Sequence, residues 1–297
     1  MYPAPFEYIR VGTWEEAVAA LSDRADQEPR VLAGGQSLVP MMALRLAKPG
    51  CLVDVNDLAG ADVRLDGTTV VIPALTRHAR LQRSAVIERH SPMMAEAASM
   101  IGNVRVRHRG TIGGSLAHAE SSAELPCVAV ATGAGILAVG PDGERSIPAR
   151  EFFQGYFTTL LGPAELVREI RVPALAERTG WAFEEFARRA GDFALVEVAA
   201  LVELDEAGES CASAEVVVGG VADRPLRATE AAGTLVGSRP DASSIARAAD
   251  VCHDAVNPAG SEYASADYRR RLVRTLTTRA LTIAAARASG AVEEAAR

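Results

Sequence analysis

The chain has 297 residues, 48% of them hydrophobic, and its formal net charge at pH 7 is −7. This length and apolar content exclude a disordered chain and a single small core, so we expect two or three packed units. The acidic balance argues against a nucleic-acid partner, because such partners bind a basic face and the one basic run is at 269–271. The longest uncharged segment, 125–141, is too short and too interrupted to span a membrane.

Several classes of chemistry lack the residues that they need. The one lysine, Lys48, stands before Pro49 and provides neither a Walker lysine nor a pyridoxal Schiff base. The four cysteines are 76, 84 and 41 residues apart and the histidines are scattered, so we expect no metal or iron-sulfur site in this chain. The N-terminal segment resembles neither a secretory signal nor a transit peptide, which makes a cytoplasmic location the expectation.

The first 55 residues predict a small α/β lobe. Thr13-Trp14-Glu15-Glu16 is a capping box, which marks the start of a helix. The predicted elements are a helix at 14–21, a strand at 30–33, a helix at 37–46 and a strand at 51–55. A helix that connects neighbouring strands usually makes them parallel.

Residues 56–175 predict a second lobe. Ser91-Pro92 begins a helix, and Pro141-Asp142-Gly143 is the turn of a hairpin. The expected elements are a strand at 70–72, helices at 76–84 and 92–101, a loop at 102–114, a helix at 123–132, a hairpin around 136–147 and a strand at 166–172.

From residue 177 the pattern predicts a separate C-terminal α+β domain, which ends at 288. Three strands at 181–189, 194–204 and 214–221 are expected to form an antiparallel meander. Helices are expected at 229–236, 241–255 and 265–288, followed by a tail at 289–297.

Two glycine-rich segments are the main functional signals. Ala33-Gly34-Gly35-Gln36-Ser37 lies between a strand and a helix, and the second segment runs from Arg109 to Ser115. Glycines allow backbone N–H groups to approach a phosphate, and a helix start adds partial positive charge. For the first segment alone, a simple glycine turn between a strand and a helix is an equal alternative.

Together the two segments predict a dinucleotide in the cleft between the lobes. Two glycine loops would hold its two phosphates, and a carboxylate such as Glu124 would accept a hydrogen bond from a ribityl hydroxyl. The site is not of the Rossmann type, because the first loop lacks GxGxxG and no acidic residue on a following strand is placed for a ribose.

Four segments of the chain carry a family resemblance. They are, in order, AGGQSLVPMMALRLAKPGCLVDV at 33–55, TIGGSLAHAESSAELPCV at 111–128, ARRAGDFALVEVAA at 187–200 and ASADYRRRLVRTLTTRAL at 264–281. The sequence resembles the FAD-binding medium subunits of molybdenum hydroxylases, the family of carbon monoxide dehydrogenase, xanthine dehydrogenase and nicotine dehydrogenase. The resemblance covers essentially the whole chain.

The resemblance implies an α+β fold: a two-lobed FAD-binding domain of the vanillyl-alcohol-oxidase/PCMH type at 1–175, then a small α+β domain with a three-stranded antiparallel sheet and helices. It implies an electron-transfer subunit that takes electrons from an iron-sulfur small subunit and passes them to an external acceptor. A molybdopterin-binding large subunit would hydroxylate the substrate, and the expected assembly is a dimer of heterotrimers. No residue is assigned to acid–base or nucleophilic catalysis.

The resemblance also implies a set of cofactor-binding residues. Those expected around the FAD pyrophosphate are Leu32, Ala33, Gly34, Gly35, Gln36, Ser37, Leu38, Thr111, Gly113, Gly114 and Ser115. Glu124 corresponds to an acidic residue on the FAD chain. Ile101 and Leu166 correspond to positions that flank the adenine, with simple core residues as an equal alternative. Asp192 and Phe193 correspond to a turn near the isoalloxazine ring, whereas Phe193 without the resemblance would be a core aromatic.

Four positions depart from the family pattern. Gln36 replaces a histidine of several relatives, which excludes histidyl attachment of FAD at this loop and predicts non-covalent binding. Ser115 replaces a common asparagine with a shorter hydrogen-bonding group. Glu185 stands where some relatives have lysine, so a cationic contact to the cofactor is not expected there, and Phe193 replaces a tyrosine.

Two other function classes stay open. One is a stand-alone flavin-dependent oxidase or reductase with the same N-terminal fold, which would need an acid or base over the flavin that the sequence does not reveal. The other is an interaction or maturation protein without the cofactor, against which the intact glycines of both loops argue.

Overall fold

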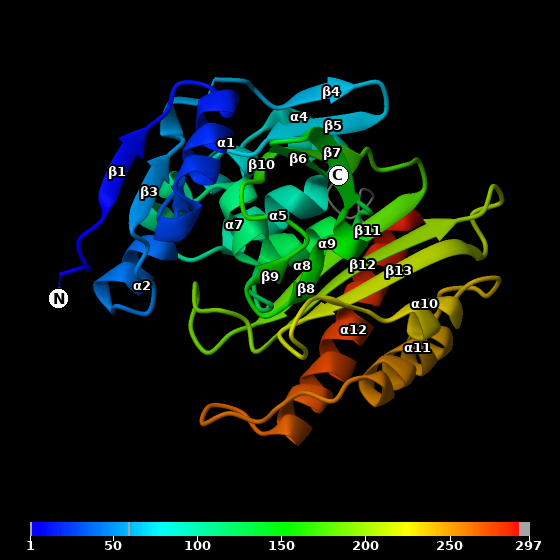
Figure 1. The fold of residues 1–297 in the computed structure, drawn as a ribbon. Coiled ribbons are helices and arrows are strands. Elements are labelled where there is room, and N and C mark those ends of the chain that lie inside the picture. The colour runs from blue at the N-terminus through cyan, green and yellow to red at the C-terminus, as the bar shows by residue number, and fades with distance from the viewer. Residues whose placement is uncertain (1, 59, 291–297) are drawn as a thin grey trace.

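The computed structural model describes residues 2–58 and 60–290, and begins with a three-stranded sheet in the order β1-β3-β2. Both outer strands run parallel to β3, so the predicted parallel pairing of 30–33 with 51–55 is confirmed. The elements are β1 (Glu7–Arg10), α1 (Trp14–Asp23), the 3-10 helix η1 (Ala25–Gln27), β2 (Arg30–Leu32), α2 (Leu38–Ala43), β3 (Cys51–Asp54) and the 3-10 helix η2 (Asn56–Leu58). This N-terminal lobe lies at one side of the molecule (Figure 1).

The predicted capping box forms at the start of α1. The Thr13 hydroxyl accepts a hydrogen bond from the amide of Glu16 at 3.1 Å, and the Glu16 carboxylate accepts one from the amide of Gly12 at 2.7 Å. These bonds satisfy amides that a helix start leaves without partners. Strand β1 was not predicted, because three of its four residues are exposed and it has no apolar run.

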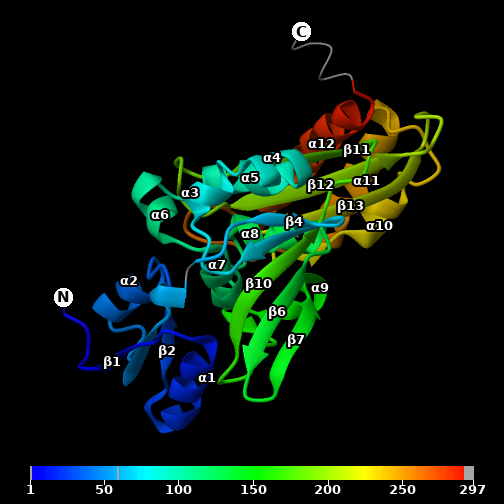
Figure 2. The same cartoon turned by 90° about the horizontal axis from the view of Figure 1, so that it is seen from above.

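The middle of the chain forms a five-stranded antiparallel sheet in the order β4-β5-β10-β6-β7. Its strands are β4 (Arg64–Asp66), β5 (Thr69–Pro73), β6 (Gly135–Gly140), β7 (Gly143–Pro148) and β10 (Leu166–Pro173), with a separate short pair β8 (Phe153–Gly155) and β9 (Thr158–Thr159). The helices are α3 (His78–Leu81), α4 (Ala85–His90), α5 (Pro92–Met100), α6 (Val104–Arg109), α7 (Ile112–His118), α8 (Glu124–Ala131) and α9 (Ala149–Phe152). The sheet stands beside the N-terminal lobe (Figure 2), and its Val139 and Leu166 join the core of that lobe.

The C-terminal part forms the predicted antiparallel meander. Its strands are β11 (Thr179–Phe186), β12 (Val196–Leu204) and β13 (Cys211–Gly219), and the two-residue strand β14 (Leu226–Arg227) extends the edge. The helices are α10 (Thr229–Gly233), α11 (Ala242–Ala255) and α12 (Ala266–Ala288). Because strand side chains alternate between faces, Phe183, Ala199 and Val217 pack with the core around α8. The opposite face packs with α11 and α12 (Figure 1).

The prediction of a loop at 102–114 is wrong, because helices α6 and α7 occupy most of that segment. The Asn103 side chain accepts hydrogen bonds from two amides at the start of α6, and the Thr111 hydroxyl accepts one from the amide of Gly114 at the start of α7. The two helices were not predicted, because the segment is rich in glycine, which disfavours helices, and in arginine, which leaves no apolar face.

Two remaining predictions concern the chain end and the membrane. The predicted tail starts at residue 289, and 291–297 lie outside the described residues. Across the described ranges, no helix combines the length and the apolar character needed to cross a membrane.

Candidate functional site

The two glycine-rich segments, predicted separately, lie against each other. Gly34 is buried, and a side-chain carbon at this position would lie 2.7 Å from the Cα atom of Gly110 and closer still to the carbonyl oxygen of Arg109. Only glycine fits at such a distance. The turn at the end of β2 is therefore held against the segment that joins α6 to α7.

The backbone amides of the first segment are not used in hydrogen bonds within the described residues. For the amides of residues 34–38, the described part of the structure contains no hydrogen-bond acceptor. Gly35 has a left-handed backbone with a φ of 71°, which redirects the chain before α2 begins at Leu38. Consecutive free amides next to a helix start are the arrangement that binds phosphate oxygens.

The second segment has a different role. The amide of Ile112 donates to Thr76 at 3.1 Å, that of Gly113 to Ala74 at 2.8 Å, and that of Gly114 to the Thr111 hydroxyl at 3.1 Å. A side chain at Gly113 would strike Ala74, so this glycine serves packing. Gly114 is exposed and borders open space apart from the Thr111 hydroxyl. This segment thus supports the first one and offers the Ser115 hydroxyl and the open face of Gly114 to a ligand.

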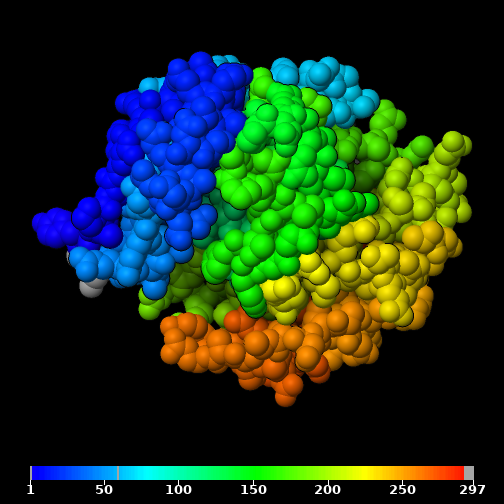
Figure 3. All heavy atoms as spheres, viewed as in Figure 1, coloured from blue at the N-terminus to red at the C-terminus, as the bar shows by residue number. Residues whose placement is uncertain are grey.

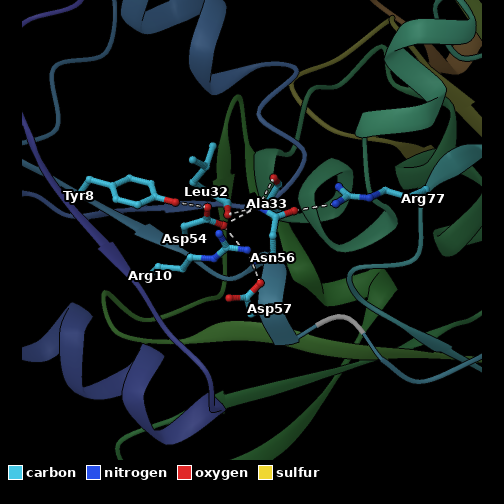
Figure 4. A network of polar contacts seen from close by, with 8 residues as sticks. All are labelled: Tyr8, Arg10, Leu32, Ala33, Asp54, Asn56, Asp57 and Arg77. Atoms are coloured by element: carbon cyan, nitrogen blue, oxygen red, sulfur yellow. Dashed lines mark hydrogen bonds and ion pairs between the residues drawn. The ribbon is translucent and has the colours of Figure 1, made fainter.

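A polar network that sequence analysis missed fastens the first segment (Figure 4). The Asn56 side-chain amide donates to the carbonyl oxygens of Leu32 at 3.3 Å and Ala33 at 3.0 Å, and to the Asp54 carboxylate at 2.5 Å. Asp54 also accepts from the Tyr8 hydroxyl at 2.5 Å. Burial acts against ionisation of Asp54, but the hydrogen bonds from Tyr8 and Asn56 outweigh it and lower the pKa of this carboxyl.

Arg77 connects this network to the second segment. Its guanidinium donates to the Asn56 side-chain oxygen at 2.6 Å and to the carbonyl oxygen of Arg109 at 2.5 Å. Burial and the neighbouring charge of Arg109 lower the pKa of Arg77. Asp54 is the last residue of a buried parallel strand and Asn56 follows it, a position where polar side chains often serve a ligand site, and this was the one signal in the sequence for the network.

Glu124 is the first residue of α8 and is buried, with 6% of its surface exposed. Burial is the main cause that raises its pKa to about 7, and the nearby Glu185 carboxylate adds to the shift. At neutral pH this carboxyl group can therefore accept or donate a hydrogen bond, which suits contact with a hydroxyl group.

The structure also brings together predicted contacts from two distant segments of the chain. Gly191 has a φ of 84°, and a side chain there would lie 2.7 Å from the carbonyl oxygen of Gly102, so the turn that carries Asp192 and Phe193 lies against the end of α5 beside Ile101. Phe193 is 61% exposed, which makes the core-aromatic alternative wrong.

Leu166 is placed differently from the other predicted residues. It is 4% exposed and belongs to the core cluster shared with the N-terminal lobe, whereas Ile101 packs at the edge of the core around α8.

In the space-filling view the N-terminal lobe, the middle sheet and the C-terminal helices adjoin on one surface (Figure 3).

A cavity of about 490 Å³ lies between α3, α6 and the segment before β4, and it is lined mainly by polar residues. It includes Arg77, Arg80, Arg83 and His108, but none of the residues predicted to contact FAD. Within 2–58 and 60–290, no group of three or more His, Cys, Asp or Glu side chains is arranged to hold a metal ion.

Two family models match the chain. Residues 4–175 match the FAD binding domain in molybdopterin dehydrogenase, and residues 181–284 match the CO dehydrogenase flavoprotein C-terminal domain.

Curated relatives extend over nearly the whole chain. The 6-hydroxypseudooxynicotine dehydrogenase complex subunit alpha of Paenarthrobacter nicotinovorans is 40% identical, with 97% of each chain covered. The carbon monoxide dehydrogenase medium chain of Hydrogenophaga pseudoflava is 38% identical, with 97% of this chain and 99% of the relative covered.

Solved structures show the same architecture. Carbon monoxide dehydrogenase from Hydrogenophaga pseudoflava superposes with a TM-score of 0.92 at 38% identity, over 97% of this chain and 99% of that one. Quinoline 2-oxidoreductase from Pseudomonas putida 86 superposes with a TM-score of 0.92 at 32% identity, over 97% and 100% of the two chains.

Proposed function

The chain belongs to the family of FAD-binding subunits of molybdopterin dehydrogenases, and from this premise we propose that it carries the flavin of a heterotrimeric molybdenum hydroxylase. In this role it receives electrons from an iron-sulfur subunit and passes them to an external acceptor. The observation that carries the proposal is the row of free amides at 34–38, fixed in place by the second glycine segment.

The residues present fit FAD. The amides of residues 34–38 bind the pyrophosphate, and the hydroxyls of Ser37 and Ser115 are available to the same group. Glu124 bonds a hydroxyl of the chain, and the exposed Phe193 covers part of the ring. FAD supplies a redox centre when bound, while the protein binds and orients it. Since Gln36 cannot form a histidyl bond, the attachment is non-covalent.

The other redox centres belong to partner subunits in this proposal. The four cysteines are buried and unpaired, and they sit in β3, α8, β13 and α11, so they cannot jointly hold an iron-sulfur cluster. Relatives are named as a complex subunit or as medium chains, which supports a molybdopterin-binding large subunit and an iron-sulfur small subunit as partners. The proposed assembly is a dimer of heterotrimers in the cytoplasm. The proposed domains of this chain are an FAD-binding domain at 1–175 and a second domain at 177–288, whose Phe193 completes the site.

A pair of glycine substitutions tests the site. Gly114→Asp places a negative charge on the open face of the second segment, and we expect the purified protein to lose its FAD through repulsion of the pyrophosphate. Gly60→Asp is the matched control, because Gly60 borders no other atom within 4 Å. The measurement is the FAD released per chain by acid. Equal flavin content in the two variants would show that the second segment is not at the pyrophosphate.

A further inference from the structure

Three carboxyl side chains lie where α8, which carries Glu124 of the proposed FAD site, packs on the C-terminal sheet. Glu185 of β11 is paired in register with Glu197 of β12, which is paired with Gly219 of β13. This row lies on the sheet face whose next positions pack with the core around α8. Glu124, the first residue of α8, approaches the row from the other side, and its carboxyl senses the charge of Glu185.

Glu124 and Glu197 are buried and Glu185 is half-buried. Glu197 is 0% exposed, and neither of its carboxyl oxygens has a hydrogen-bond partner. One carboxyl oxygen of Glu185 is also buried without a partner. Gly219 leaves the space that the Glu197 side chain fills, since any side chain at Gly219 would collide with it. In the described part of the molecule, no arginine, lysine or histidine forms an ion pair with Glu124, Glu185 or Glu197.

The remaining groups around the cluster do not compensate it either. Glu120 adds a further acidic charge, and burial keeps the Cys127 thiol and the His118 imidazole neutral by raising the pKa of the thiol and lowering that of the imidazole. Arg269 of α12 donates to the carbonyl oxygens of Leu195 and Gly220 on the neighbouring backbone instead. A buried carboxylate without a partner is strongly disfavoured, so protons must remain in the cluster.

We propose that Glu124, Glu185 and Glu197 form a carboxylic-acid cluster that takes up a proton when FAD binds, with Glu124 as the group that changes its protonation. The proposal rests on the assignment of Glu124 to the FAD chain. Bound FAD would cover Glu124 and bring two phosphate charges nearer, and both effects favour the neutral acid. Glu197 already holds its proton in the free protein, because burial raises its pKa well above the ordinary range.

The direction of the pH dependence follows from linkage. In the free protein the pKa of Glu124 is about 7. FAD binding prefers the protonated form, so affinity is greatest below this pH and falls as the pH rises through 7. The fall is limited to about tenfold per pH unit, since one proton is exchanged.

The experiment is a calorimetric titration of FAD into the FAD-free full chain. It is run between pH 6 and pH 8.5 in pairs of buffers that differ in ionisation enthalpy, so that the number of protons taken up is measured directly. We expect roughly half a proton per FAD at pH 7, rising towards one at higher pH. Glu124→Gln should abolish the uptake and flatten the pH dependence of affinity, whereas Glu197→Gln, which imitates the protonated acid, should keep both.

Glu203→Gln is the matched control, because Glu203 lies on the same strand, is partly exposed and binds the Ser213 hydroxyl at 2.7 Å. FAD binding without proton uptake in the unmodified chain would overturn the cluster proposal while leaving the FAD site intact. Uptake that persists in Glu124→Gln and disappears in Glu197→Gln would overturn the assignment to Glu124. Absence of FAD binding under all conditions would instead contradict the proposed function.

Discussion

At the scale of single residues, Glu197 is an acid buried without any hydrogen-bond partner for its carboxyl group. Its side chain lies between β11 and β13, where it contacts neither solvent nor a hydrogen-bond donor. Burial therefore raises its pKa, and the folded state keeps it protonated. An unfolded chain releases that proton near the ordinary glutamate pKa. The folded protein therefore pays a protonation cost that grows as the pH rises.

Replacement of this acid by its neutral amide should stabilise the protein. Because the pKa of Glu197 is raised in the folded state, stability is fully present below the unfolded pKa and is lost as pH rises towards the folded value. Glu197→Gln removes this loss, and we expect its advantage to grow by at most about 1.4 kcal/mol per pH unit above pH 5. Urea unfolding at pH 5, 6, 7 and 8 measures it, with Glu203→Gln as control. A constant difference across this range would mean that Glu197 is ionised in the fold.

At the scale of elements, the site depends on how two turns are joined. The turn after β2 and the turn before α7 are far apart in the sequence, and the contact between Gly34 and Arg109 is completed by Asn56 and Arg77. Local pattern could find both glycine segments and the helix that follows the first. For Asn56 it offered only the position after a buried parallel strand, and it could not find Tyr8 and Arg77, because their roles come from contacts between residues distant in the chain.

Loss of the Asn56 side chain should therefore weaken both the fold and the cofactor site. Asn56→Ala leaves Arg77 without its side-chain acceptor and frees the carbonyl oxygens of Leu32 and Ala33. We expect a loss of about 1–3 kcal/mol in unfolding free energy, and a fall in FAD affinity of roughly tenfold or more. The control is Asn257→Ala, an exposed asparagine bonded to Arg270 at 3.0 Å. FAD affinity is measured by fluorescence titration. An unchanged affinity in Asn56→Ala would show that the polar network around Asn56 does not support FAD binding.

Burial decides which helices and strands the sequence could predict. Strands with apolar runs, such as β3, β5 and β12, are buried over most of their length and were predicted close to their bounds. The exposed strands β1 and β4 were missed, because their polar residues carry no burial pattern. Helix α6, with the sequence VRVRHR, also lacks an apolar face and is fixed by the Asn103 cap.

At the scale of the whole molecule, the C-terminal sheet connects the flavin site to the rest of the chain. One of its faces packs with the core around α8, and the turn between β11 and β12 carries Phe193 to the end of α5. The proposed FAD site thus uses both matched regions, 4–175 and 181–284, rather than the first alone. The family resemblance, not periodicity, was needed to predict this use of the second region.

The central claim is that the two joined glycine segments hold FAD without a covalent bond, and one measurement tests it most directly. The full chain is purified, its visible absorption spectrum is recorded, and the supernatant is analysed after acid precipitation. We predict flavin absorption bands and release of about one FAD per chain into the supernatant, as expected for a dedicated cofactor site. A colourless protein that stays colourless after incubation with FAD, or flavin that remains in the precipitate, would contradict the account.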